Sequence, residues 1–277
     1  MNSQERLQAL SAFLKARRAQ ISPDTVGLPA GIRRRTPGLR REEVAQLAGV
    51  STTWYTWLEQ GRDIQVSVSV LESISRALQL TMDERNYLFA LALETGTSVP
   101  PLEDTSLRIS PSLQKILKEL KYCPTIISDR RCHIVGWNEA ARRVFLNFDE
   151  ISAEGRNMIR LLFARQEFRR LAVNWEDFVS GFLAIFRAYY GKYVGDEWYN
   201  LFLAEMKEAH PDFSRLWEDS KVSSSPEVTL EFRHAKAGRM LFELTSLQVQ
   251  GETDLRCSVY TPKLESTTEL KLLQLMS

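Results

Sequence analysis

The sequence is poor in residues that bind metals or cross-link a chain. Its 277 residues include three histidines and three cysteines, Cys123, Cys132 and Cys257. An odd, scattered set of cysteines forms no disulfide framework, and neither residue type has the spacing of zinc ligands. We therefore expect reduced thiols, no metal site and no cofactor.

The sequence also lacks long apolar runs. No stretch approaches the ~18 apolar residues of a membrane-spanning helix. The first twenty residues interleave charges with leucines, whereas a signal peptide has an apolar central segment. The sequence therefore predicts a cytoplasmic protein that does not enter a membrane.

Few residues are arranged as a catalytic site requires. An enzyme would need a nucleophile with a base, a pair of carboxylates or a set of metal ligands. Cys132 and His133 are adjacent on a predicted strand, so their side chains point to opposite faces and form no dyad. We expect no enzyme, and an acyl-group enzyme is the weaker alternative.

Charge is distributed unevenly, although the net charge is only +1. Residues 1–41 contain nine Lys or Arg and two acidic residues, a net charge of +7. The remainder contains 27 basic and 33 acidic residues, a net charge of −6. Because a basic segment is attracted to a phosphate backbone, the N-terminal part is the candidate for binding nucleic acid.

Residues 33–62 predict two short helices joined by a tight turn. Residues 39–48 have apolar side chains at helical spacing, and Gly49 follows where the chain reverses and positive φ is favoured. Ser51 then has the position of an N-cap for a second helix over residues 51–60. This pattern is typical of a helix-turn-helix, and also of the helical hairpins in ordinary helical domains.

The side chains of the second helix favour DNA binding over the plain hairpin. Val50, Tyr55 and Leu58 share an inner face, so hydroxyls and an indole point outward, where a major groove offers base edges. Guanidinium groups ahead of the motif bind phosphates or enter a minor groove. The predicted DNA contacts are Arg33, Arg34, Arg35, Arg40, Arg41, Ser51, Thr52, Thr53, Thr56, Trp57 and Arg62. We expect a homodimer on an inverted repeat in double-stranded DNA.

Three further segments have the apolar spacing of helices that complete a compact bundle. They are residues 4–20, 67–80 and 83–93. At the C-terminal end of the first helix, one of three cations either pairs with Glu59 or contacts DNA, and both alternatives stay open. These cations are Lys15, Arg17 and Arg18.

The composition changes after the helical domain, residues 1–95. Residues 96–108 are polar and rich in turn-forming residues, which is typical of a linker. Residues 109–262 contain a β-hairpin signature, later strands and helices between them, so we expect an α+β domain with an antiparallel sheet. The predicted strands are residues 125–128, 133–136, 227–233, 240–249 and 255–260. Residues 263–277 are expected to form a C-terminal tail.

Two successive helices of the second domain are unusually aromatic. Residues 175–190 are apolar on nearly every side, and residues 197–209 add further large apolar side chains. Both helices are therefore expected to be buried on more than one face. Large aromatics over a sheet either fill a core or line an apolar pocket, and composition alone favours the core.

The sequence resembles the MmyB-like branch of bacterial xenobiotic-response-element (XRE) transcriptional regulators. Its first half carries FLKARRAQISPDTVGLP, RRRTPGLRREEVAQLAGVS and WLEQGRD, and its second half carries PSLQKIL, VGWNEAARRVF, NMIRLLF, DFSRLW and VYT. The resemblance implies a lambda-repressor-like helix-turn-helix domain, a PAS-like sensor domain and a ligand pocket. The first half is the more specific match.

Three departures from the family pattern bear on function. The second helix carries Trp57 where the family usually has arginine, so one phosphate contact is missing or replaced by packing. EDSKVSS stands in place of a histidine-rich segment after Trp217, and KLESTTE replaces a Gly-Ser-Pro-Ser stretch near the end. The roles that the family gives to these segments are not carried over.

With this resemblance, we expect the second domain to bind a small, largely apolar ligand such as a fatty acid. The predicted ligand contacts are Phe178, Phe182, Phe186, Arg187, Phe202 and Met206. Arg187 is the candidate partner for a carboxylate, and a surface arginine is an equal alternative. A rival interpretation is a protein-interaction module whose aromatic helices form an interface without a ligand.

Overall fold

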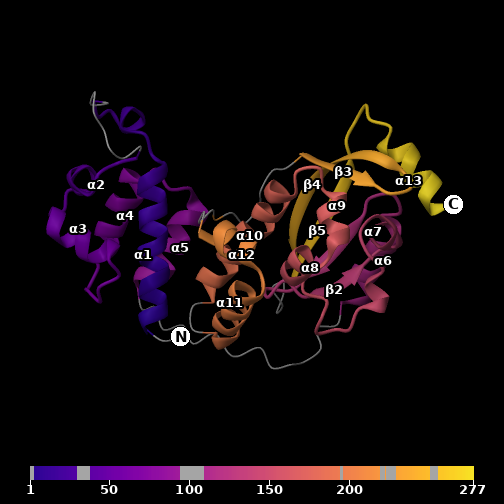
Figure 1. The fold of residues 1–277 in the computed structure, drawn as a ribbon, viewed down its shortest axis with the longest axis horizontal. Helices are drawn as coiled ribbons and strands as arrows, with labels where there is room; N and C mark the ends of the chain where they lie inside the picture. The colour runs from indigo at the N-terminus through magenta and orange to yellow at the C-terminus, as the bar shows by residue number, and fades with distance from the viewer. Residues whose placement is uncertain are drawn as a thin grey trace. The chain divides into compact units, whose positions relative to one another are not determined.

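The computed structural model describes residues 3–29, 38–93, 109–193, 196–218, 222, 229–249 and 255–277. Its elements form two compact units (Figure 1). The first groups residues 1–101 with residues 187–224, and the second groups residues 102–186 with residues 225–277. The expected linker, residues 96–108, lies outside the described residues.

The N-terminal part of the first unit is a helical bundle, as predicted, in which α2–α5 gather around α1 (Figure 1). Its core contains Phe13, Leu14, Val44, Leu71 and Leu88, all with at most 1% of their surface exposed. The elements are α1 (Ser3–Gln20), η1 (Pro23–Val26), α2 (Arg41–Ala48), α3 (Thr52–Glu59), α4 (Val68–Ala77) and α5 (Met82–Ala92).

The turn between α2 and α3 has the predicted chemistry. Gly49 adopts φ of 69°, and its amide donates to the carbonyl of Gln46 at 3.2 Å. Ser51 caps α3, since its hydroxyl accepts a hydrogen bond from the Trp54 amide at 3.1 Å. The apolar face of α2 is narrower than the sequence implied, because Leu47 lies 38% exposed.

Two glycines of the motif give a matched prediction about stability. Gly61 and Gly49 both adopt φ near 70°, a conformation that costs alanine about 1–2 kcal/mol. A Cβ at Gly61 would also lie 2.5 Å from the Leu7 carbonyl oxygen, whereas nothing lies within 4 Å of one at Gly49. We expect Gly61→Ala to lower the free energy of unfolding in urea by at least about 1 kcal/mol more than Gly49→Ala. Equal losses would show that α1 moves aside without cost.

The first unit also contains residues that the sequence assigned to the second domain. They comprise the end of α10 (Trp175–Lys192), α11 (Glu197–Ala209) and α12 (Pro211–Glu218). Tyr190 of α10 lies against Tyr87 of α5 with ring centroids 6.5 Å apart, and Tyr87 lies edge-on to Phe13 at 5.1 Å. Tyr190 also contacts Tyr199 and Trp217 at 6.0 and 6.2 Å. This aromatic cluster therefore joins residues that are distant in sequence.

The second unit is built on a five-stranded antiparallel sheet, which confirms the predicted α+β class. The strand order is β2-β1-β5-β4-β3, and every neighbouring pair is antiparallel. The strands are β1 (Thr125–Ser128), β2 (Ile134–Trp137), β3 (Thr229–His234), β4 (Gly238–Val249) and β5 (Leu255–Pro262). All five overlap the strands expected from β-branched and aromatic runs.

Helices cover both faces of this sheet. Along β5, Leu255, Cys257 and Val259 face the outer side, where they pack against Leu113 and Leu117 of α6. The alternate residues of β5 face the inner side, towards α8 and α10. The helices of this unit are α6 (Pro111–Glu119), α7 (Glu139–Val144), η2 (Phe148–Glu150), α8 (Met158–Ala164), α9 (Gln166–Leu171), the first part of α10, and α13 (Thr268–Met276).

The last residues, expected as a tail, include a packed helix. In α13 the side chain of Leu272 is fully buried. The Thr268 hydroxyl accepts a hydrogen bond from the Leu241 amide of β4 at 2.8 Å. Residues 268–276 therefore belong to the fold of the second unit.

Candidate DNA interface and ligand pocket

Helix α3 has one buried and one exposed face. Tyr55 and Leu58 are at most 1% exposed and fix the helix to the bundle. Thr52, Thr53 and Trp57 are exposed, and Trp57 is 39% exposed. The helix therefore presents hydroxyls and an indole on its open side, which are groups that can contact base edges.

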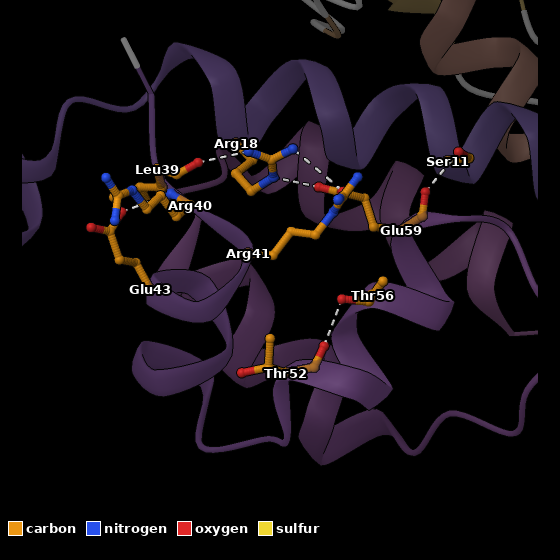
Figure 2. Close-up of polar contacts among 9 residues, drawn as sticks. All are labelled: Ser11, Arg18, Leu39, Arg40, Arg41, Glu43, Thr52, Thr56 and Glu59. Atoms are coloured by element: carbon orange, nitrogen blue, oxygen red, sulfur yellow. Dashed lines mark hydrogen bonds and ion pairs between the residues drawn. The ribbon is translucent and has the colours of Figure 1, made fainter. Parts of the chain in front are cut away.

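A buried carboxylate holds α3 in place. The Glu59 side chain is fully buried, and its two oxygens form ion pairs with the Nε atoms of Arg18 and Arg41 (Figure 2). Arg18 also donates to the Leu39 carbonyl at 2.7 Å, and the Ser11 hydroxyl donates to the Glu59 carbonyl at 2.7 Å. These contacts connect α1, the start of α2 and the end of α3, and thereby fix the orientation of the exposed face.

These contacts show which cation at the C-terminal end of α1 pairs with Glu59, a question that the sequence left open. Arg18 pairs with Glu59, and Arg17 pairs with Glu84 of α5 at 2.6 Å. Both arginines are therefore part of the bundle's internal charge pairing. The pKa of the Tyr55 hydroxyl is raised chiefly by its burial. The negative charge of the nearby Glu59 carboxylate raises this pKa further.

The predicted DNA contacts have different surroundings. Arg40 is exposed next to the N-terminus of α2, where its amide donates to the Glu43 carboxylate at 2.7 Å. The Arg41 side chain is 41% exposed although it pairs with Glu59. The Arg62 guanidinium lies 5.6 Å from the centre of the Trp57 ring. Arg33, Arg34 and Arg35 lie outside the described residues.

Two of the predicted hydroxyl contacts are partly used within the helix. Ser51 is exposed but accepts the capping hydrogen bond of α3. Thr56 is half-buried, and its hydroxyl donates to the Thr52 carbonyl at 2.7 Å (Figure 2). Thr52, Thr53 and Trp57 are therefore the α3 side chains that are most open to a partner.

The structure divides the six predicted ligand contacts between the two units. Phe178, Phe182 and Phe186 of α10 are buried in the second unit, where Phe178 contacts Phe182 and Phe232 edge-on at 5.3 and 5.4 Å. Phe202 and Met206 of α11 are buried in the first unit. The sequence did not show this division, because both helices have the same aromatic pattern.

Arg187 belongs to the first unit and is occupied there. It is 3% exposed, its guanidinium lies 4.0 Å from the centre of the Trp217 ring, and its Nη2 donates to the Trp217 carbonyl. The positive charge therefore stabilises the packing of α12 on the end of α10. Its burial contradicts the alternative of a surface arginine, and its role as a carboxylate partner stays a prediction.

The inner face of the sheet contains a small cavity beside α10. Phe182 lines it together with Ser128, Arg256, Ser258 and Tyr260. Its volume is about 10 Å³, close to the smallest space that holds one water molecule. Burial raises the pKa of the Tyr260 hydroxyl, so this group stays protonated. An apolar ligand here would have to displace the aromatic side chains that fill the core.

A larger groove lies on the outer side of the same unit. It has a volume of about 520 Å³ and is lined by α6, β2, the start of α7, η2 and the end of α13. Lys118 and Lys121 lie on the α6 side, and Trp137 lies on β2. The sequence signal for this groove was the VGWNEAARRVF segment, but its hollow shape depends on α13, which was not predicted.

Asn138 organises the wall of this groove. Its side-chain oxygen accepts from the amides of Thr125 at 3.0 Å and Ala141 at 2.9 Å, and its amide donates to the carbonyls of Leu120 at 2.6 Å and Cys123 at 2.9 Å. This one side chain therefore joins the end of α6, β1 and the start of α7. The conformation around Trp137 is fixed as a result.

The cysteines do not form disulfides in the described part of the chain. Cys123, Cys132 and Cys257 are free thiols, and burial raises the pKa of Cys132 in particular. Within the described ranges, no three His, Cys, Asp or Glu side chains are grouped so that they could hold a metal ion. None of the helices in those ranges combines the length and apolar character needed to cross a bilayer.

Comparison with protein families agrees with the division into a DNA-binding and a sensing part. A family model described as a helix-turn-helix domain matches residues 9–88. A second, described as the MmyB-like transcription regulator ligand binding domain, matches residues 109–276. No curated protein matches the chain. The chain therefore belongs to the family of MmyB-like transcription regulators and combines a helix-turn-helix domain with a ligand-binding domain.

Proposed function

We propose that this regulator reads operator DNA through the exposed face of α3 and changes its DNA affinity when a small, largely apolar ligand binds. The observation that carries the DNA-binding part is the two-sided burial of α3. Tyr55, Leu58 and Glu59 fix the helix, whereas Thr52, Thr53 and Trp57 remain open. A helix held rigidly from behind loses little conformational freedom when it enters a major groove.

The departure at position 57 has a local compensation. Where the family usually has arginine, Trp57 offers an apolar surface that fits a thymine methyl group or a deoxyribose. The guanidinium beside its ring belongs to Arg62, so a positive charge is still present at this end of α3. We expect an operator preference that includes thymine opposite Trp57.

A dimer on an inverted repeat is the expected assembly. A single helix-turn-helix buries little DNA surface, and two copies related by a twofold axis gain affinity by occupying two half-sites. The protein would act in the cytoplasm, where bacterial DNA is found, and its role requires binding and no catalysis.

The PAS-like interpretation of the second unit is supported by its topology. Its five antiparallel strands have the spatial order β2-β1-β5-β4-β3. In the sequence, most helices of the unit come after β2 and before β3. Such a sheet with a helical layer can hold a small molecule on either face. A fatty acid is the ligand class to test first, because the unit offers apolar side chains on both faces.

The dependence of DNA affinity on salt tests the electrostatic part of the proposal. We expect replacement of Arg33, Arg34 and Arg35 by Ala to reduce the salt dependence of DNA binding. The slope of the logarithm of the association constant against the logarithm of the salt concentration should flatten by up to about 3 units, one for each lost phosphate contact. The measurement is fluorescence anisotropy of a labelled duplex at several salt concentrations. Arg239→Ala, which removes an exposed arginine paired with Glu231 in the second unit, is the control. An unchanged slope in the triple variant would remove these arginines from the interface.

A further inference from the structure

The helix-turn-helix bundle packs against a segment that the family comparison assigns to the ligand-binding domain. Residues 187–224 lie within the ligand-binding match, residues 109–276, yet they belong to the same compact unit as the bundle. The bundle also has a core of its own, in which Leu71 and Leu88 are fully buried. The contact therefore joins two parts of the chain that match different families.

Tyr87 of α5 lies at the centre of this contact. Its ring centroid is 5.1 Å from that of Phe13 in α1 and 6.5 Å from that of Tyr190 in α10. Tyr190 in turn packs edge-on against Tyr199 of α11 and Trp217 of α12. Tyr87 and Tyr190 are at most 5% exposed. A chain of aromatic rings therefore leads from the core of the bundle to α10, α11 and α12.

Gly191 allows a close approach of α10 to this chain of rings. A Cβ at this position would overlap Cδ2 of Tyr87 and lie 2.9 Å from its Cε2, so the ring occupies the space that a side chain would need. Glycine is a poorer helix former than alanine, and Gly191 is buried in the last turn of α10. Close packing on Tyr87 gives a physical reason for glycine at this position. We call Tyr87, Tyr190 and Gly191 the tyrosine joint.

The tyrosine joint leaves the DNA-reading face open. Thr52, Thr53 and Trp57 of α3 are exposed while Tyr87 is buried. The bundle can therefore bind DNA with the joint closed. A role in which the joint simply covers the reading helix does not fit this arrangement.

The joint is also connected to the second unit through the backbone of one helix. Gly191 ends the same continuous helix, α10, that carries Phe178 and Phe182. These two phenylalanines are buried in the second unit, whereas Gly191 belongs to the first. A displacement of α10 in the second unit therefore has a covalent route to the joint.

We infer that the tyrosine joint is the point at which the ligand-binding domain controls DNA binding. With the joint closed, the bundle is held in one orientation on α10, and the two bundles of a dimer occupy both half-sites of an operator together. With the joint open, each bundle moves on its own and binds half-sites independently. This inference rests on the proposed function, because it names the device by which a ligand changes DNA affinity.

Linked binding gives this small contact a large effect. Two linked sites held in the right geometry bind about 100–10,000 times more tightly than one alone, without any new contact. The gain is lost when the geometry no longer allows both sites to be occupied together. Opening the joint therefore lowers affinity for an inverted repeat and leaves the contacts of α3 with each half-site unchanged.

Fluorescence anisotropy of the full-length protein with two duplexes tests this inference. One duplex carries the inverted repeat that the protein selects from random DNA, and the other has one half-site scrambled. We expect Gly191→Ala to weaken binding to the inverted repeat at least about tenfold, because the added methyl group collides with the Tyr87 ring. Gly191→Leu, which adds a larger side chain, should weaken it at least as much. Binding to the single half-site should stay within about twofold, which also shows that the bundle remains folded.

Leu201→Ala is the matched control. Leu201 is 64% exposed on α11, in the same unit but outside the joint, so its replacement should alter neither affinity. Native-state hydrogen exchange gives a second readout that needs no DNA. The amides of α5 and of the last turn of α10 should exchange faster in the Gly191 variants, whereas those of α3 should keep their rates.

Three results would overturn the inference. They are unchanged binding of the inverted repeat by both Gly191 variants, equal weakening of binding to both duplexes, and an equal effect of Leu201→Ala. If the unchanged protein gains no affinity from the second half-site, the proposed dimer on an inverted repeat fails. Hydrogen exchange then still decides whether the joint is closed, since equal rates in α5 and α10 of all variants would show that it is not.

Discussion

We expect Glu59→Gln to be among the most destabilising single substitutions in the helix-turn-helix. Glu59 is fully buried and neutralises Arg18 and Arg41, so the amide would leave two guanidinium groups without their counter-charge. Removing one partner of a buried ion pair costs about 3–5 kcal/mol. Because Arg41 is partly exposed and can turn towards water, the expected loss of unfolding free energy lies near the lower end, about 3 kcal/mol. Urea denaturation followed by circular dichroism measures it.

The matched control for this substitution is Glu72→Gln. Glu72 pairs with Arg85 near the surface, where solvent screens the charges, and the carboxyl pKa is lowered chiefly by its hydrogen bond to Arg85. We expect little change in the urea midpoint of this variant. If the Glu59→Gln variant unfolds at the same urea concentration as the unchanged protein, the ion pairs of Glu59 do not hold α3 in place.

We expect replacement of both Thr53 and Trp57 by Ala to reduce affinity for a specific operator by about a hundredfold or more. Both side chains are exposed on α3, and each lost base contact typically costs about 1–3 kcal/mol. Affinity for unrelated duplexes and the salt slope should change little, because the arginines that we propose as phosphate contacts remain. Anisotropy titrations with a specific and a scrambled duplex measure both quantities.

The control for the DNA-reading face is Met82→Ala. Met82 is 67% exposed at the start of α5, so its removal changes a surface side chain outside the helix-turn-helix. It should leave both affinities unchanged. If the double variant of α3 weakens binding to both duplexes equally, the side chains contribute to general affinity and do not read sequence.

The two predictions above depend on parts of the fold that short stretches of the sequence predict. Gly49 and Ser51 mark the turn and the cap, and their geometry follows from the backbone freedom of glycine and the acceptor hydroxyl of serine. Residues 255–260 were likewise expected as a strand, and the structure contains β5 at Leu255–Pro262. Such patterns depend on neighbours within a few residues.

Contacts between distant segments could not be predicted in the same way. Three cations of α1 had suitable spacing to approach Glu59, and only the packing of α1 against α3 selects Arg18. Tyr87 and Tyr190 are separated by most of the second unit in sequence, yet their rings meet. Periodicity reports which face of a helix is buried and gives no information about its partner.

The expected ligand contacts and the outer groove show the same limit more clearly. Phe182 and Phe202 lie on similar aromatic helices, but the structure places them in different units. The groove lined by Lys118, Trp137 and Met276 arises from segments that are distant in sequence, one of which was expected to be a tail. Shape and charge at such a junction depend on tertiary packing that a single sequence does not encode in a local pattern.

Selection of duplexes from a random DNA pool by the full-length protein tests the central claim most directly. The account predicts enrichment of an inverted repeat whose half-site centres are separated by about one helical turn, roughly 10 base pairs, or a multiple of it. It also predicts that the variant lacking Thr53 and Trp57 loses this enrichment while it still retains DNA at low salt. A pool that stays random with the unchanged protein, or the same enriched sequence with the variant, would contradict the reading of DNA by the exposed face of α3.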